Sequence, residues 1–309
     1  MELDQYSMEG DRMTRTSCTF SAALTLAVFA TASLFSFSAQ AKHQDLSAKV
    51  IYGKDNRLDL YQVNDTRLRE LAASTVALMS AGDVTIDGTK AHLKETIIGP
   101  YYGLCSDEPF YNQNSAAFCS GFLVAPDTIA SAGHCIRSQA SCEDTKFVFD
   151  FVMNSAGDRA VEVPASNVYS CKQLIHSVAN GHGEDFSVVK LDRPVSGRRP
   201  LSLAAQTPSR GTPLTVIGYP IGLPVKVAGG ASVRDLKPEF LVANLDTFGG
   251  NSGSAVFNTN TGAVEGILVR GERDFITDGA CRRSNVCTDS GCRGEDVTLI
   301  KQTFPYLEQ

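Results

Sequence analysis

The chain has 309 residues, of which 43% are hydrophobic and 20% charged, and its formal net charge is -6 at pH 7. This length and composition are those of a globular protein with one large domain or two small ones. A mildly acidic chain with no basic stripe and no aromatic platform pattern is not expected to bind nucleic acid.

Residues 1–41 have the pattern of an export signal. Two arginines near the start precede a hydrophobic stretch over residues 20–37, and Ala39-Gln40-Ala41 fits the small-x-small cleavage rule. We therefore expect cleavage before Lys42 and a secreted protein, extracellular or periplasmic. The alternative is an uncleaved membrane anchor, because the stretch approaches the length that spans a bilayer. Membrane contact is expected only in that case.

An even number of cysteines remains after this segment: Cys105, Cys119, Cys135, Cys142, Cys171, Cys281, Cys287 and Cys292. In an exported chain this pattern predicts disulfides, although the sequence alone does not assign the partners. We expect the pairs Cys119–Cys135 and Cys105–Cys142, and the remaining four stay unassigned. A zinc site at the last three cysteines is the weaker alternative, because their spacings lack a CxxC knuckle and no histidine lies nearby.

Most of the exported chain predicts short β-strands separated by turns that contain Gly and Pro. The β-rich segments of strand length are 118–124, 146–152, 186–191, 214–218, 254–257 and 264–269. Helical signals are few, the best being residues 66–79 and a short terminal segment at 303–309. Many short strands with few helices predict an all-β protein, either a sandwich or barrels. Residues 192–213, rich in Pro, Arg, Ser and Gly, are the expected connector between two halves.

Two stretches carry the chemical signal, Ala130-Ser131-Ala132-Gly133-His134-Cys135 and Gly249-Gly250-Asn251-Ser252-Gly253-Ser254. A serine hydroxyl becomes a useful nucleophile when a histidine takes its proton and backbone N–H groups stabilise the resulting oxyanion. Glycines around the serine allow the crowded backbone that aims those N–H groups into a site. The two stretches together therefore predict nucleophilic catalysis by Ser252.

His134 and Asp185 are the expected partners of this serine. A buried histidine bonded to backbone is the ordinary alternative for His134, but a Cys119–Cys135 bridge across one hairpin would fix its backbone. Asp185 begins a β-rich segment, where a carboxylate can accept the other imidazole N–H and set the tautomer. The histidine of the Gly-rich loop at 181–183 is expected to be exposed.

The chain order His134, Asp185, Ser252 and the motifs around them resemble those of trypsin/chymotrypsin-like serine proteases. The resemblance extends over nearly everything after the signal. It implies two six-stranded antiparallel β-barrels, one over about 50–195 and one over about 196–309, with the site in the cleft between them. It also implies an oxyanion hole made by the N–H groups of Gly250 and Ser252.

The same resemblance implies a serine endopeptidase that acts on protein or peptide substrates through an acyl-enzyme. It implies no metal, no organic cofactor and a monomer. A non-catalytic binding module on the same fold is the alternative.

Two departures resemble the bacterial glutamyl-endopeptidase-like branch of the family. Asn251, not aspartate, precedes the serine, so an N-terminal ammonium is not expected to activate the enzyme by pairing there. Only 67 residues along the chain separate Asp185 from Ser252. The branch implies a zymogen whose short propeptide, residues 42–49, is removed to leave Val50 as the mature start. The alternative is that this peptide bond stays intact.

In this family the pocket for the side chain before the cleaved bond is formed by residues just before the nucleophile and by a later strand. Asp246 predicts a weak preference for Arg or Lys, because an unpaired buried carboxylate is costly. The alternative is that Asp246 faces a turn, or pairs with Arg270 or the Val50 amine. Thr247 matches the glutamyl branch, but Leu268 stands where that branch has a histidine. Glutamyl specificity, with Arg270 attracting the acid, remains the second possibility.

Overall fold

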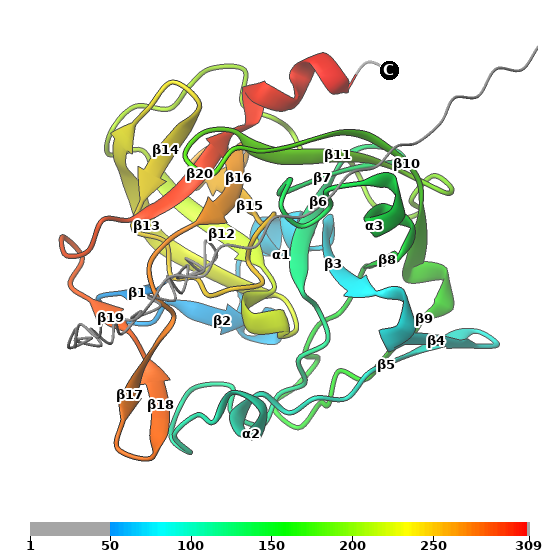
Figure 1. Cartoon of the computed structure of the whole chain (residues 1–309), viewed down its shortest axis with the longest axis horizontal. Helices are drawn as coiled ribbons and strands as arrows, with labels where there is room; N and C mark the ends of the chain where they lie inside the picture. The colour runs from blue at the N-terminus through cyan, green and yellow to red at the C-terminus, as the bar shows by residue number, and fades with distance from the viewer. Residues whose placement is uncertain (1–49, 308–309) are drawn as a thin grey trace, which may run out of the picture. The chain divides into compact units, whose positions relative to one another are not determined.

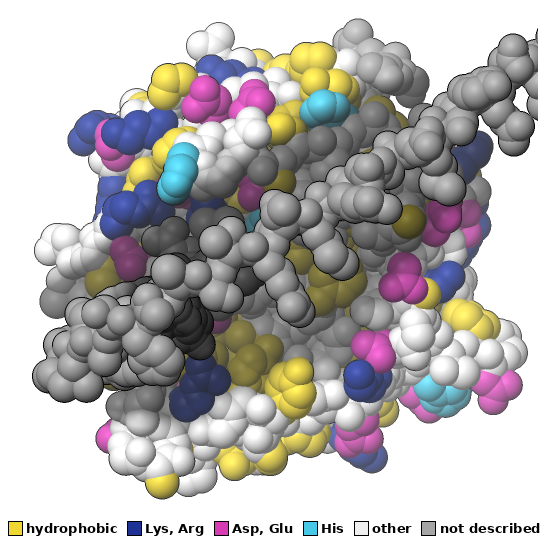
Figure 2. Space-filling model, viewed as in Figure 1, with side chains coloured by type: hydrophobic (Ala, Val, Ile, Leu, Met, Phe, Trp, Pro, Cys, Tyr) yellow, Lys and Arg dark blue, Asp and Glu magenta, His cyan; other side chains and the backbone are white. Residues whose placement is uncertain are grey.

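The computed structural model describes residues 50–307 (Figure 1). The expected signal over 1–41 and the expected propeptide over 42–49 lie outside the described residues. Within 50–307, no helix is both long and apolar enough to cross a bilayer. On the face shown in Figure 2, Lys and Arg side chains lie among Asp and Glu side chains and form no continuous basic surface.

Six antiparallel strands close the first barrel, in the order β10-β11-β7-β6-β3-β8. These strands are β3 (Thr75–Ser80), β6 (Cys119–Ala125), β7 (Thr128–Ser131), β8 (Thr145–Val148), β10 (Val168–Ala179) and β11 (Asp185–Leu191).

The second barrel is an antiparallel sheet whose first strand, β12, also pairs with its sixth, β13, which closes a ring of six, and β2 (Arg57–Asp59) joins it at β13. The six strands are β12 (Pro213–Gly218), β13 (Lys226–Leu236), β14 (Phe240–Ala243), β15 (Ala255–Asn258), β16 (Val264–Arg270) and β20 (Glu295–Leu299). The predicted fold of two six-stranded antiparallel barrels is therefore confirmed.

Strand alternation divides the core into three layers, because successive side chains point to opposite faces of a strand. In β3, Val76 and Leu78 join the cluster that fills the first barrel, whereas Ala77 and Met79 join a cluster that continues to Ile217 of β12. A third cluster fills the second barrel. The middle cluster packs the barrels against each other, so it fixes the position of any site that uses residues from both.

Smaller elements surround the barrels. The strands are β1 (Ile51–Tyr52), which pairs with β19 (Val286–Cys287), a sheet of β4 (Val84–Asp87), β5 (Lys90–Leu93) and β9 (Glu162–Pro164), and a hairpin of β17 (Phe275–Asp278) and β18 (Cys281–Ser284). The described α-helices are α1 (Thr66–Ala72), α2 (Ile98–Tyr102) and α3 (Gln139–Glu143). Short 3₁₀ helices lie at Leu60–Gln62, Ala81–Asp83, Ala165–Asn167, Pro220–Gly222 and Ile300–Tyr306.

Three expectations about secondary structure differ from the structure. The helix expected over 66–79 ends at Ala72. The strand β3 follows it, because the alternating side chains of residues 76–79 pack into two different hydrophobic clusters. The terminal helix is a 3₁₀ segment over Ile300–Tyr306. Residues 50–59 were expected with the first half, but β1 and β2 pair with strands of the second half.

The described residues form four disulfides: Cys105–Cys281, Cys119–Cys135, Cys142–Cys171 and Cys287–Cys292. The expected Cys119–Cys135 bridge is confirmed. The expected Cys105–Cys142 bridge is wrong, because the backbone of Cys105 pairs with β18, where its N–H donates to the carbonyl of Arg282 at 3.0 Å. The zinc alternative also fails, since each of its cysteines lies in a disulfide.

Candidate active site

His134 and Asp185 are joined by two hydrogen bonds. The backbone N–H of His134 donates to Oδ1 of Asp185 at 3.0 Å, and the imidazole Nδ1 lies 2.8 Å from Oδ2. Asp185 opens β11 and is only 4% exposed. A carboxylate that accepts the Nδ1 proton leaves Nε2 as the acceptor, and Nε2 can then take a proton from a nucleophile.

A glycine places this histidine. A Cβ on Gly133 would lie 1.9 Å from the carbonyl oxygen of Val178, so no other residue fits between β7 and β10. Hydroxyl groups secure the turn, since Ser177 donates to the carbonyl of Gly133 at 3.2 Å and Ser187 to that of Ala132 at 3.1 Å. The turn that ends β7 is therefore fixed by packing.

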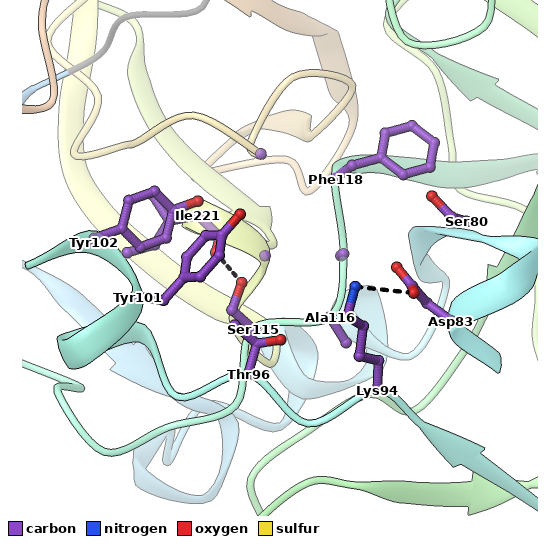
Figure 3. A pocket seen from close by; sticks show the side chains of 13 residues that line it. Ser80, Asp83, Lys94, Thr96, Tyr101, Tyr102, Ser115, Ala116, Phe118 and Ile221 are labelled. Carbon is purple, nitrogen blue, oxygen red and sulfur yellow. Dashed lines mark hydrogen bonds and ion pairs between the residues drawn. The ribbon is translucent and has the colours of Figure 1, made fainter.

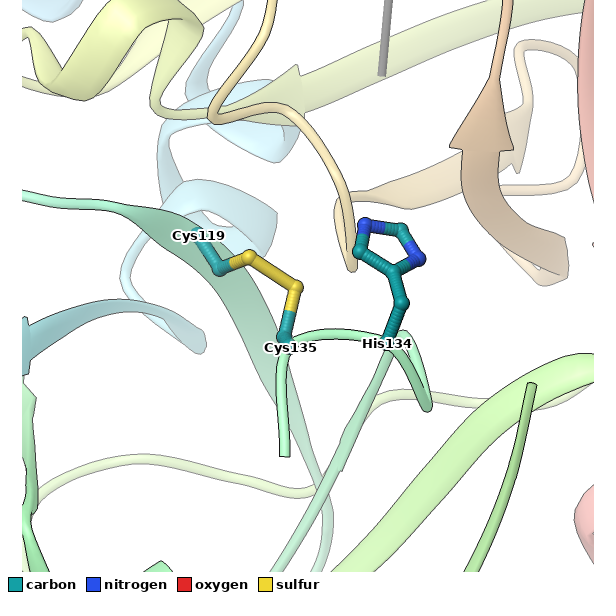
Figure 4. A group of neighbouring side chains, drawn as sticks. All are labelled: Cys119, His134 and Cys135. Carbon is teal, nitrogen blue, oxygen red and sulfur yellow. A yellow bond between two sulfur atoms is a disulfide. The ribbon is translucent and has the colours of Figure 1, made fainter. Parts of the chain in front are cut away.

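Cys119, His134 and Cys135 lie close enough together to suggest a metal site, with ligand atoms within 4.8 Å of one another (Figure 4). The two sulfur atoms are bonded to each other. Because the thiolate is the form that binds metals, this disulfide cannot serve as a ligand pair. The group ties β6 to the histidine turn instead.

Ser252 lies in the loop between β14 and β15 of the second barrel, and this loop reaches the first barrel. The carbonyl of Ser252 accepts a hydrogen bond from the backbone N–H of Ser120 in β6 at 2.8 Å. The same carbonyl lies 3.7 Å from Sγ of Cys135, the residue that follows His134. The serine loop is thus held directly beside the histidine turn.

Two glycines of this loop have positive φ. Gly253, at φ +91°, lies against β6, where a Cβ would be 1.9 Å from the carbonyl oxygen of Ser120. Gly250 has φ +82°, and its carbonyl accepts the Ser120 hydroxyl at 2.8 Å. Within residues 50–307, the N–H of Gly250 donates to no acceptor. The geometry suits a loop that aims an N–H outward.

Asn251 has a local role. The residue is 3% exposed, and its Oδ1 accepts a hydrogen bond from the hydroxyl of Ser254 at 3.1 Å. Its backbone N–H donates to Phe248 at 3.1 Å, and the N–H of Ser254 returns to its carbonyl at 2.8 Å. The residue therefore closes the serine loop on itself.

Asp246 holds the N-terminal segment of the described chain. Its Oδ1 accepts the backbone N–H of Tyr52 at 2.7 Å, and Oδ2 accepts that of Asn56 at 2.9 Å. Burial raises its pKa from 3.8 to about 6, against the effect of these two donors. Both carboxylate oxygens are occupied by backbone amides, so Asp246 is poorly placed to bind a substrate.

The other expected pocket residues separate. Leu268 is fully buried in the second barrel. Its backbone carbonyl accepts a hydrogen bond from the N–H of Gly253 in the serine loop at 2.8 Å. Arg270 turns toward Asp185: it lies 3.7 Å from Oδ2 of Asp185 and 3.2 Å from Oδ2 of Asp296. Thr247 donates its hydroxyl to Oε2 of Glu295 at 3.3 Å. The sequence reasoning missed this contact between Thr247 and the buried Glu295.

A cavity of about 330 Å³ is lined by Gly250 of the serine loop, by residues 115–118 and by residues 221–222 (Figure 3). Lys94 and Asp83 form an ion pair of 3.2 Å at one end of it, and Tyr101 and Tyr102 lie at the other. The cavity next to the serine loop is therefore lined by both aromatic and charged side chains.

Residues 119–267 match the family model described as the trypsin-like peptidase domain. The glutamyl endopeptidase of Bacillus licheniformis is 26% identical over 211 residues, which are 65% of this chain and 63% of the relative. The trypsin of Sarcophaga bullata is 29% identical over 117 residues, 36% of this chain and 42% of the relative. The chain thus spans less than two thirds of the length of either relative.

Among solved structures, a Glu endopeptidase superposes with a TM-score of 0.48 at 20% identity, covering 84% of this chain and 98% of that one. The active form of the Rv3671c protease of M. tuberculosis gives 0.45 at 16% identity, covering 84% of this chain and 90% of that one.

Proposed function

Because the chain carries a trypsin-like peptidase domain, we propose that it is a secreted serine endopeptidase that cleaves proteins or peptides through an acyl-enzyme. The observation that carries this proposal is the pair of hydrogen bonds between His134 and Asp185, beside the loop that bears Ser252. A non-catalytic binding module would have no need to keep this pair intact.

In the proposed reaction the hydroxyl of Ser252 attacks the scissile carbonyl while Nε2 of His134 takes its proton. The backbone N–H groups of Gly250 and Ser252 stabilise the oxyanion. The imidazolium then protonates the leaving amine, and the C–N bond breaks to give the acyl-enzyme. Water, deprotonated by the same imidazole, releases the acid product. Residues after the cleaved bond would enter the cavity beside Gly250.

In these reaction steps Asp185 acts as a positioning residue for His134. It fixes the tautomer and stabilises the imidazolium that forms when the proton is transferred. The guanidinium of Arg270, 3.7 Å from Oδ2, supplies a buried countercharge to it.

Secretion is supported by the four disulfides of the described residues, because such bonds form and persist in oxidising compartments. The resemblance to the glutamyl-endopeptidase-like branch supports removal of residues 42–49, which would leave Val50 as the first residue. This residue is fully buried, and its carbonyl accepts the N–H of Thr247 at 3.3 Å. N-terminal sequencing of the secreted enzyme tests the cut, and fully active protein beginning at Lys42 would refute it.

For specificity we propose a preference for Arg or Lys before the cleaved bond. Glutamyl specificity is the alternative that the Bacillus relative suggests by its name. Two features weigh against it: Leu268 is apolar and buried, and the charge of Arg270 faces Asp185 and Asp296.

Casein hydrolysis by Ser252→Ala tests the proposed activity, with the exposed Ser155→Ala as the matched control. We expect the control to hydrolyse casein like the wild type and Ser252→Ala to lose about 10⁶-fold in kcat. Unchanged hydrolysis by Ser252→Ala would remove this serine from the mechanism.

A further inference from the structure

The segment over residues 50–57 contacts three consecutive residues that lead into the serine loop. Asp246 accepts two of its backbone N–H groups at 2.7 and 2.9 Å, and the N–H of Thr247 donates to one of its carbonyls at 3.3 Å. The third residue, Phe248, lies under the guanidinium of Arg57, whose Cζ is 4.1 Å from the centre of the ring. The start of the serine loop is therefore held by the first residues of the described chain.

The guanidinium of Arg57 has a fixed place, because the residue is only 5% exposed. Its Nε and Nη2 donate to the two carboxylate oxygens of Asp55 at 2.9 and 2.7 Å. Against the burial that raises it, these contacts lower the pKa of the Asp55 carboxyl, so the pair is charged at neutral pH. A cation–π contact is stronger when the cation is desolvated. The contact between this guanidinium and the ring of Phe248 is of that kind.

A buried ion pair anchors the strand that carries Arg57. Lys226 of β13 lies 2.8 Å from a carboxylate oxygen of Asp59 in β2, and these side chains are 2% and 4% exposed. Phe110 lies against both cations, with its ring centre 5.3 Å from Cζ of Arg57 and 4.8 Å from Nζ of Lys226. Its φ of +62° is a strained conformation for a residue with a side chain, which persists only where the surroundings hold it. The guanidinium is thus held on a rigid frame.

Phe248 passes this position on to the serine loop. The residue is 2% exposed, and its ring packs against Phe275 with the ring centres 4.9 Å apart. Its carbonyl accepts the N–H of Asn251 at 3.1 Å, in the turn that leads to Ser252. This turn contains Gly250, whose N–H is the expected oxyanion donor. A shift of the ring would therefore displace that N–H.

We propose that Arg57 is a positioning residue for the oxyanion hole: through Phe248 it holds the N–H of Gly250 where the oxyanion forms. The inference rests on the proposed endopeptidase function and adds a residue to its machinery. No N-terminal ammonium is expected to pair at Asn251, and Arg57 provides a cation from the same end of the chain. Unlike an N-terminal ammonium, its charge exists before any cut of the chain.

The experiment compares the secreted wild type with Arg57→Met, which retains much of the side-chain volume and removes the charge. Arg198→Met is the matched control. Arg198 is also an arginine with a side chain that is 9% exposed, paired with Asp150 at 2.6 Å and 4.8 Å from the ring centre of Phe149. Its two partners directly follow β8 of the first barrel, so this control removes a similar buried cation away from the serine loop.

Two readouts separate positioning from folding. Rates on a peptide amide are divided by the number of active sites titrated to completion with a fluorophosphonate. We expect Arg57→Met to lower kcat about 100-fold and to leave KM unchanged, because a small misplacement of a catalytic group costs about that much. The second readout is the inhibition constant Ki of a peptide aldehyde, whose tetrahedral adduct places its oxygen in the oxyanion hole. It should rise about 100-fold, whereas the Ki of the corresponding peptide alcohol should not change.

Arg57→Lys retains a charge over the ring of Phe248 but cannot form the bidentate pair with Asp55, so it should recover part of the loss. If Arg57→Met does not fold, Arg57→Lys carries the test, and an aldehyde-to-alcohol Ki ratio equal to that of the wild type would then refute the proposal.

Three results with Arg57→Met would overturn the proposal: wild-type kcat per titrated site, equal changes in the Ki of aldehyde and alcohol, or the same loss in Arg198→Met. If the wild type contains no serine that the fluorophosphonate titrates, the proposed function itself fails. If the serine titrates and only the variant results disagree, the role of Arg57 alone is rejected.

Discussion

The buried carboxylate of Asp246 should make the stability of the protein depend on pH. The perturbation is Asp246→Asn, made in a Ser252→Ala background that prevents self-digestion. Burial raises the pKa of Asp246 from 3.8 to about 6 in the folded protein. Between these values the folded state keeps a proton that the unfolded state has released. The free energy of unfolding must therefore fall as the pH rises through this window.

The size of the effect follows from the shift. About 2 pH units at about 1.36 kcal/mol per unit give about 3 kcal/mol. Urea unfolding at pH 3.5 to 7.5, with disulfides intact, measures the wild-type free energy of unfolding relative to that of Asp246→Asn. We expect this difference to fall by about 3 kcal/mol with rising pH and then to level off above pH 6. A flat difference, or one that rises with pH, would refute the reasoning. A flat difference would mean that the N–H groups of Tyr52 and Asn56 offset burial, and a rising one that they outweigh it.

Three further predictions concern the site and its frame. Asp185→Asn should lower kcat by about 10⁴-fold by removing the tautomer constraint on the imidazole; a loss below about 10-fold in steady-state assays would argue against this role. Gly253→Ala should abolish fluorophosphonate labelling, because its Cβ would lie 1.9 Å from a β6 carbonyl, whereas Gly157→Ala, in open space, should label normally. Replacing Cys142 and Cys171 by serine should cost about 3.5 kcal/mol in urea unfolding, since the bridge closes a separation of 29 residues; an unchanged midpoint would contradict this.

The sequence was most informative where function depends on short motifs. The runs that contain His134 and Ser252 also contain the glycines that close packing requires there, so local composition predicted two tightly packed turns. The contact of Asp185 with His134 could be predicted because Asp185 opens a strand of strong β-pattern. The two-barrel fold followed from many short strands together with the resemblance those motifs carry.

The pocket could not be predicted in the same way, because long-range contacts decide it. Asp246 was expected to bind substrate, yet its oxygens accept amides from residues about 190 positions earlier in the chain. Arg270 was expected to line the substrate pocket, yet its guanidinium lies 3.7 Å from Asp185 of the other barrel.

The expected Cys105–Cys142 pair was wrong for the same reason. Cys105 and Cys142 are the nearer pair along the chain, but the backbone pairing of the Cys105 segment with β18 brings Cys281 to it. Cys142 lies in α3, and it shares the first-barrel core with Cys171.

The most direct test of the account is the location of the covalent adduct that a fluorophosphonate forms with the secreted enzyme. Peptide mass spectrometry should find one adduct per molecule, on Ser252. His134→Ala should remove it, because no base then activates the hydroxyl. An adduct on another residue, or full peptide hydrolysis by enzyme whose Ser252 is completely modified, would contradict the central claim.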